Sequence, residues 1–166
     1  HGPGVSDTEI KIGQTMPYSG PLSSYGTIGR AQAAYFEMIN AKGGVNGRRI
    51  RLISRDDGFT PPKTVEHTRR LVESDNVLLI FSSLGSPTNS AIYKYLNAQK
   101  VPHVFAISGA AKFEDPKHYP WTMRWHPGFQ VEADLDDDAV RGLVENGALD
   151  PDGPEPQIIQ RLLEPP

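Results

Sequence analysis

The sequence contains no cysteine among its 166 residues, which excludes disulfide bonds and thiolate metal sites. No apolar run approaches the roughly 20 residues that a membrane-spanning helix requires. The first residues lack the basic end and apolar middle that mark a secretory leader. The formal net charge is −3 and 37% of the residues are hydrophobic, so the composition indicates neither nucleic-acid binding nor membrane insertion. A stable fold must come from packing alone.

Motifs of catalysis and phosphate binding are missing too. Neither GxxxxGK[ST] nor GxGxxG follows the first strand-like segment, and no GxSxG pattern marks a nucleophile. The histidines do not have metal-ligand spacing, and Ser108 has no base evident from the sequence. Asp56 and Asp57 are adjacent and resemble a catalytic or metal-binding pair, but such a pair more often ends a strand, caps a neighbouring residue or faces solvent. We therefore expect no enzyme, no cofactor and no metal site.

What the sequence does contain is an alternation of strand-like and helix-like segments. Strands are predicted in TEIKIGQTM (8–16), RRIRLISRDD (48–57), NVLLIFSS (76–83) and VPHVFAIS (101–108), with a short fifth in WTMRWHP (121–127). Helices are predicted between the first four strands. This order favours right-handed crossovers and a doubly wound, mainly parallel α/β sheet of the Rossmann or flavodoxin-like class.

The helices are predicted from apolar residues at steps of three and four. The first, over 26–42, would bury Ile28, Ala31, Tyr35 and Met38 or Ile39. The second, capped by Thr60, would bury Val65, Thr68 and Leu71 or Val72. The third, with Ser86 as N-cap and Pro87 in its first position, would bury Ile92, Tyr95 and Leu96.

The composition changes near Asp134. Residues 1–133 carry 15 basic and 11 acidic side chains, whereas residues 134–166 carry 2 and 9. Five of the 15 prolines also lie in the second segment. We predict one domain over 1–133, followed by an acidic, proline-rich tail with two short helices over 134–166.

Candidate binding residues lie where strands hand over to helices. Ligands of open α/β sheets bind beyond the carboxyl ends of the strands, and the four loops predicted there are rich in Gly, Ser and Thr. In IFSSLGSPTNSAIYKYL (80–96), a helix start with the hydroxyls of Ser86 and Thr88 suits a carboxylate, because helix N-termini attract anions. The alternative is simple helix capping. Tyr25 would either stack on a ligand or form a half-buried contact at a helix start.

Several motifs resemble one family: SGPLSSYG (19–26), INAKGGVNGR (39–48), DDGFTPPKT (56–64) and the Gly-Ser-Pro-Thr turn at 85–88. Together they resemble the type I periplasmic solute-binding proteins of branched-chain amino acid ABC transporters, the Leu/Ile/Val-binding group. The resemblance runs from about residue 8 to about residue 133, and YPWTMRWHPGFQVEA (119–133) resembles the passage between the family's two lobes. Residues 134–166 resemble nothing in the family.

The resemblance implies a first lobe that captures a small carboxylate-bearing solute, such as a branched-chain amino acid or another organic or aromatic acid, for an ABC transporter permease in the periplasm. It assigns ligand contacts to Tyr25, Gly85, Ser86, Thr88, Ile107, Ser108 and Gly109. The second lobe of the family has no counterpart in this sequence, so we expect a chain truncated to one lobe, with weak binding. The alternative is a half-lobe that self-associates, as a homodimer, in a structural or regulatory role.

Overall fold

The protein is described by a computed structural model that covers residues 1–134, 141 and 142. The chain divides into two compact units, 1–126 and 127–166. In the second unit residues 129–134 are helical, and apart from positions 134, 141 and 142 the predicted tail helices lie outside the described residues. In the described part of the chain, no helix has both the length and the hydrophobicity to cross a membrane.

The first unit contains a five-stranded sheet in the order β2-β1-β3-β4-β5. Every neighbouring pair is parallel, which confirms the predicted α/β class. The strands are β1 (Glu9–Met16), β2 (Arg49–Asp56), β3 (Leu79–Phe81), β4 (His103–Ala106) and β5 (Thr122–Arg124). β1 and β2 pair over their whole length, from Glu9 opposite Arg49 to Met16 opposite Asp56.

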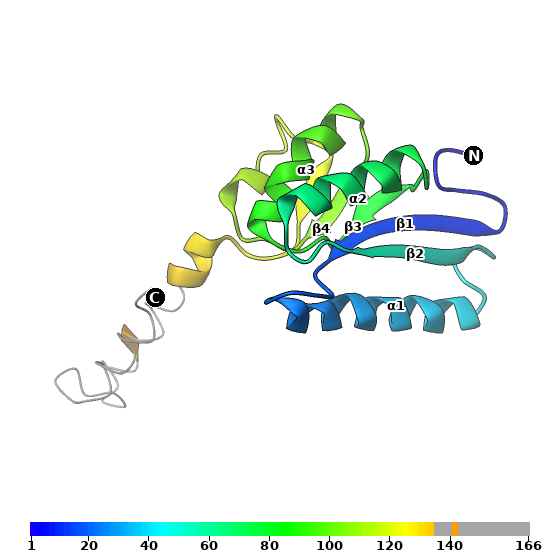
Figure 1. Ribbon diagram of the computed structural model, residues 1–166, viewed down its shortest axis with the longest axis horizontal. Coiled ribbons are helices and arrows are strands. Elements are labelled where there is room, and N and C mark those ends of the chain that lie inside the picture. Colours follow the sequence, from blue (N-terminus) through cyan, green and yellow to red (C-terminus); the bar gives the residue numbers. More distant parts are fainter. Residues whose placement is uncertain (135–140, 143–166) are drawn as a thin grey trace. The chain divides into compact units, whose positions relative to one another are not determined.

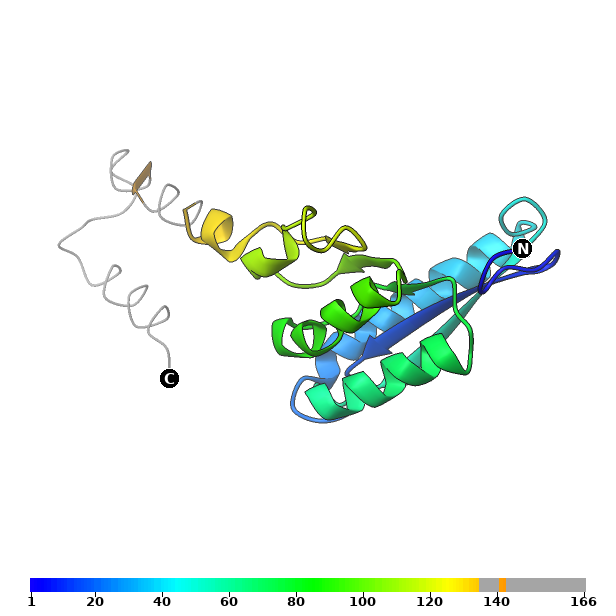
Figure 2. The same ribbon diagram turned by 90° about the horizontal axis from the view of Figure 1, so that it is seen from above.

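Helices lie on both faces of this sheet (Figures 1 and 2). They are α1 (Gly26–Ala41), α2 (Pro61–Glu73) and α3 (Ser86–Ala98). The helix α1 runs along one face beneath β1 and β2, while α2 and α3 lie side by side on the other face. The carboxyl ends of all five strands therefore point to one edge.

The face under α2 and α3 carries the apolar core. Its buried cluster consists of Leu71, Val77, Ile80, Ile92 and Leu96. The predicted inward positions of α2 and α3 are confirmed, since Leu71 and Leu96 have no exposed surface and Ile92 has 1%. Each such side chain stabilises the fold by about 1.5–3 kcal/mol.

The predicted inner face of α1 was right for Ile28 and Ile39, which are half-buried, and wrong for the exposed Ala31, Tyr35 and Met38. Tyr35 is 58% exposed and Met38 is 43% exposed, whereas Asn40 is buried. Its Nδ2 donates to the carbonyl oxygen of Ile50 at 2.8 Å, and its Oδ1 accepts from the Ile50 N–H at 2.7 Å. Gln32 also faces the sheet and donates to a buried serine. Because α1 is attached through hydrogen bonds as well as apolar contacts, hydrophobic periodicity identified only part of its inner face.

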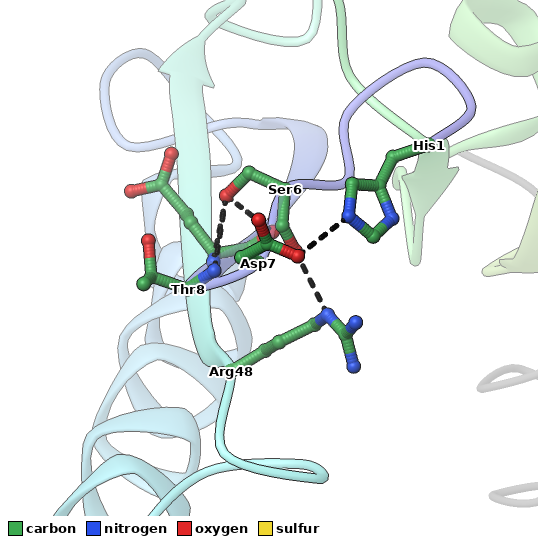
Figure 3. Close-up of polar contacts among 6 residues, drawn as sticks. His1, Ser6, Asp7, Thr8 and Arg48 are labelled. Atoms are coloured by element: carbon green, nitrogen blue, oxygen red, sulfur yellow. Dashed lines mark hydrogen bonds and ion pairs between the residues drawn. The ribbon is translucent and has the colours of Figure 1, made fainter.

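Polar contacts fasten the amino ends of β1 and β2 (Figure 3). Ser6 Oγ accepts from the N–H of Thr8 at 3.3 Å, and the Ser6 carbonyl accepts from Arg48 Nε at 2.8 Å. Asp7 contacts His1 Nε2 at 2.8 Å. Arg48 directly precedes β2, so the start of the chain is tied to the start of that strand, at the edge opposite the carboxyl ends.

Candidate functional site

Four loops meet at the carboxyl edge of the sheet. We call them L1 (17–25), L2 (57–60), L3 (82–85) and L4 (107–110), after β1, β2, β3 and β4 in turn. Asp56, the last residue of β2, joins the first two. Its Oδ1 accepts from the N–H groups of Tyr18 at 2.9 Å, Ser19 at 3.1 Å and Gly58 at 3.0 Å. Partial burial opposes ionisation, but hydrogen bonds from Ser19, Gly58 and Tyr18 outweigh it and lower the pKa of Asp56.

The neighbouring carboxylate shapes L2 itself. Asp57 is fully buried, its Oδ1 accepts from the Phe59 N–H at 2.9 Å and its Oδ2 accepts from Thr64 Oγ1 at 2.8 Å. Burial raises the pKa of Asp57. Both carboxylates therefore organise the loops at the end of β2. Among the described residues, no group of three or more His, Cys, Asp or Glu side chains has the geometry to hold a metal ion.

Gly85 is the residue that joins L3 to α3. Its φ is +105° and its ψ is 142°, a backbone conformation that only glycine adopts readily. A Cβ at this position would lie 2.3 Å from Phe59 Cε2. Gly85 is the N-cap of α3, so the helix begins at Ser86, one residue earlier than predicted, and Pro87 is its second residue. The close approach of Phe59 brings L2 against L3.

L3 and L4 run side by side and form the centre of the site. The Gly85 N–H donates to the Ile107 carbonyl at 3.0 Å, and Leu84 pairs with Ile107 in a parallel bridge. The hydroxyl oxygens of Ser86 and Ser108 lie 2.7 Å apart. Because two hydroxyls share this single hydrogen bond, one of their two protons remains to be donated to a ligand.

The other predicted contact residues differ in what they offer. Thr88 is buried, and its hydroxyl donates to the carbonyls of Leu84 and of Gly85, the latter at 3.0 Å. Only its backbone N–H is then left for a ligand, since the first N–H groups of a helix have no acceptor within it. Gly109 is buried in L4 next to Ser108.

Tyr25 and Ile107 make no polar contact with the Ser86–Ser108 pair among the contacts of the described residues. Tyr25 ends the short 3-10 turn Ser23–Tyr25 in L1 and is 49% exposed. In residues 1–134, no hydrogen bond or ring contact joins it to Ser86 or Ser108. The Ile107 side chain lines a pocket on the α1 face of the sheet.

A buried network beneath α3, which the sequence did not reveal, supports the site. Ser83 Oγ donates to Asn89 Oδ1 at 2.6 Å and lies 2.7 Å from His103 Nε2. Because the Ser83 proton goes to Asn89, the imidazole must donate through Nε2. Burial lowers the pKa of His103 to about 4, so its ring is neutral. All three side chains are fully buried, which keeps this Ser–His pair from acting on a substrate.

The arrangement can bind an anion without a cation. The start of α3 supplies N–H groups and the positive end of the helix dipole, and Ser86 and Ser108 supply a hydroxyl proton. Sequence reasoning anticipated the meeting of the Gly-Ser-Pro-Thr turn with L4. It missed Phe59 and Asn89. The only signal for Phe59 was its place in DDGFTPP between an Asp pair and a proline pair.

The sequence of the chain matches a known protein family and several known proteins. The sequence pattern of the family described as periplasmic binding protein matches residues 9–146. The Leu/Ile/Val-binding protein homolog 7 of Brucella abortus (strain 2308) is 35% identical over 103 residues, which are 61% of this chain and 26% of that protein. The chain thus spans about a quarter of the length of the curated relatives that it matches.

Solved structures give the same result for the fold. The fatty acid ABC transporter substrate-binding protein from Thermomonospora curvata superimposes with a TM-score of 0.69 and 30% identity, over 89% of this chain and 36% of that one. The branched-chain amino acid transporter substrate binding protein from Streptococcus pneumoniae, in complex with isoleucine, gives a TM-score of 0.53 and 28% identity, over 57% of this chain and 28% of that one.

Proposed function

The chain belongs to the periplasmic binding protein family, and we propose that it binds a small carboxylate-bearing solute at the start of α3, as the substrate-binding part of an ABC importer. Members of this family are solute-binding proteins rather than enzymes. The observation that carries the proposal is the pair of hydroxyls of Ser86 and Ser108, 2.7 Å apart, at a helix start whose first N–H groups have no acceptor within the helix.

We assign the roles as follows. The carboxylate accepts from the backbone N–H groups of Ser86 and Thr88 and from the free proton of the Ser86–Ser108 pair. Gly85 and Gly109 let the backbone approach closely, since neither carries a side chain. Tyr25 covers the solute from L1.

The solute class follows from the same contacts. Hydrogen bonds to a charged group contribute about 1.5–3 kcal/mol each, so two or three of them favour an acid strongly over its amide. The named solutes of the similar proteins, fatty acids and the branched-chain amino acid isoleucine, are all carboxylic acids. We therefore propose a branched-chain amino acid or another organic acid, aromatic acids included. The location that we propose is the periplasm, and the partner is the permease of an ABC transporter.

Calorimetric titration of the purified chain tests the proposal. The panel is leucine, isoleucine, valine, octanoate and benzoate, with leucinamide as the matched compound that lacks the carboxylate. We expect at least one acid to bind, and leucinamide to bind at least tenfold more weakly than leucine if leucine is that acid. Equal binding of acid and amide would contradict the carboxylate site.

Two variants connect the binding to the site. Ser86→Ala and Ser108→Ala should each weaken binding of the acid about tenfold, since each removes a hydroxyl from the shared pair. Because the two hydroxyls act together, the double variant should lose less than the product of the two effects. Ser74→Ala, at an exposed position after α2, is the control and should bind as the unaltered chain does. Unchanged binding in both site variants would refute these assignments.

A second candidate function is self-association in a structural or regulatory role. The observation in its favour is exposed aromatic surface, since Trp125 is 68% exposed and Tyr35 is 58% exposed, and contiguous exposed apolar surface marks protein–protein interaction sites. Sedimentation velocity with the same acids separates the two candidates. A monomer that binds an acid supports solute capture, whereas a dimer that binds none supports self-association.

A further inference from the structure

Asn89, in the first turn of α3, binds the hydroxyl and the carbonyl of one residue of L3. Ser83 Oγ donates to Asn89 Oδ1 at 2.6 Å, and Asn89 Nδ2 donates to the Ser83 carbonyl at 3.0 Å. Neither residue has any exposed surface. The two bonds use opposite ends of the amide, so they fix its orientation. They also fix the distance between the first turn of α3 and L3.

The Ser83 carbonyl is at the same time an acceptor for L4. The Ile107 N–H donates to it at 2.9 Å, so α3 and L4 together use both of its lone pairs. In return, the Gly85 N–H donates to the Ile107 carbonyl at 3.0 Å. Gly85 directly precedes Ser86, and Ile107 directly precedes Ser108. The bonds around the Ser83 carbonyl therefore determine where both hydroxyls of the proposed carboxylate site lie.

His103 fixes the hydroxyl of Ser83 from the opposite side. Its Nε2 lies 2.7 Å from Ser83 Oγ, while its Nδ1 is buried and has no hydrogen-bond partner among the described residues. Because Ser83 gives its proton to Asn89, the ring donates from Nε2. His103 is the first residue of β4, the strand that leads into L4. We call these three side chains the Ser83 network. All three are fully buried, so the network does not depend on any surface that is open to solvent.

The Ser83 network anchors the start of α3 without capping it. A helix is commonly anchored by an N-cap side chain that accepts from its first N–H groups. The N-cap of α3 is Gly85, and no side chain caps this helix. Asn89 instead bonds to L3, and Thr88 Oγ1 donates to the carbonyl of Leu84. These bonds fix the position of the helix start and leave its first N–H groups as donors for a ligand.

We propose that Asn89 and His103 are positioning residues for the carboxylate site. Acting through Ser83, they fix the distance between Ser86 and Ser108 and keep the first N–H groups of α3 uncapped. This inference rests on the proposed capture of a carboxylate. A carboxylate presents two acceptor oxygens, whereas an amide presents one acceptor and an N–H₂ donor group. The alignment of several donors therefore matters more for an acid than for its amide, and the network sets the preference for acids.

Calorimetry with three matched pairs of probes tests the role of Asn89. The pairs are leucine with leucinamide, octanoate with octanamide, and benzoate with benzamide. In Asn89→Ala, the acid that the unaltered chain binds should lose about tenfold in affinity, and its amide less than about threefold. A general weakening of the fold would affect both members of a pair equally. Equal losses for acid and amide, or no loss for either, would overturn the proposal.

Asn40→Ala is the matched control. Asn40 also binds two groups of a single residue, since its Nδ2 donates to the Ile50 carbonyl and its Oδ1 accepts from the Ile50 N–H, and it is only 8% exposed. It belongs to α1 and has no bond to L3 or L4. Asn40→Ala should lower the stability to urea and leave the preference for acid over amide unchanged. If the preference falls as much in Asn40→Ala as in Asn89→Ala, the loss of any buried asparagine is sufficient and the proposal is overturned.

Two variants of His103 test the other end of the network. His103→Gln keeps an N–H donor for Ser83, whereas His103→Leu removes it. The preference for acid over amide should fall about threefold in His103→Leu and be retained in His103→Gln. Equal preferences in these two variants would overturn the role of His103. Nitrogen NMR of the ring provides an independent measurement, because a proton found on Nδ1 instead of Nε2 would reverse the order of donors. If Asn89→Ala does not fold, this pair of variants decides the proposal.

Amide hydrogen exchange measures the positioning without any solute. In Asn89→Ala, exchange should accelerate at the N–H groups of Gly85 and Ile107 and stay unchanged at Ile50, and Asn40→Ala should show the reverse. If the unaltered chain binds no acid, solute capture is refuted, and the exchange rates alone decide whether Asn89 joins L3 to L4. If an acid binds and Asn89→Ala changes neither its preference nor these exchange rates, the positioning role is refuted while solute capture stands.

Discussion

Replacing Gly85 with alanine probes the point where three loops meet. Two penalties combine in this variant. The φ of +105° and ψ of 142° lie in a region that is essentially restricted to glycine, at a cost of about 1–3 kcal/mol. The new Cβ would also lie 2.3 Å from Phe59 Cε2 and 2.7 Å from Thr88 Oγ1, and overpacking of a filled site costs a further 1–3 kcal/mol or so.

Gly43→Ala is the matched control, because it separates the two penalties. Gly43 has a φ of +99°, close to that of Gly85, but nothing lies within 4 Å of the Cβ position. We therefore expect a loss of about 1–3 kcal/mol in the free energy of unfolding for Gly43→Ala, from the backbone alone, and about 2–6 kcal/mol for Gly85→Ala.

Urea unfolding followed by tryptophan fluorescence measures both variants, and calorimetry of the acid measures the consequence for binding. Gly85→Ala should weaken acid binding, since relief of the contact with Phe59 moves the start of α3, whereas Gly43→Ala should leave binding unchanged. Losses that agree within about 0.5 kcal/mol would refute the reasoning, because they would mean that the space around Gly85 has no influence.

Two further predictions concern buried titration and the joining of L1 to L2. Burial lowers the pKa of His103 from 6.5 to about 4, so between these pH values the unfolded chain takes up a proton that the folded chain does not. The free energy of unfolding should therefore be highest above pH 6.5 and fall by about 2 kcal/mol between pH 7 and pH 5. Urea unfolding of a His103→Gln variant measures this, and the same pH dependence in that variant would contradict it. Asp56→Ala removes the acceptor of three N–H groups, so amide exchange of Tyr18, Ser19 and Gly58 should accelerate while exchange within β1 does not, and a uniform acceleration would indicate general destabilisation instead.

The fold was predictable to different degrees on the two faces of the sheet. On the α2 and α3 face, apolar residues at helical spacing contact the core, so Leu71, Ile92 and Leu96 were identified correctly. On the α1 face, burial follows hydrogen bonding instead. Asn40 is buried because it pairs with the backbone of β2, and Tyr35 is exposed although it is aromatic. Hydropathy contains no information about such partners.

The meeting of L3 and L4 at the candidate site was predictable, because the order of the strands in the sheet determines it. Ser86 and Ser108 follow adjacent parallel strands, so their loops had to meet at the carboxyl edge. The contact of Phe59 with Gly85 and the left-handed backbone of Ser82 and Phe105 were not predictable. They depend on distances between loops and on local strain, to which the residue types give no direct signal.

The ties between the loops have a consequence for the speed of capture. Asp56 fastens L1 to L2, Phe59 presses L2 against Gly85, and Gly85 donates to L4. All of these contacts join residues of the chain to one another, so folding of the chain orders the loops. On the solute-capture proposal, the association rate of an acid should follow diffusion and vary with solvent viscosity rather than with a slow rearrangement of the loops.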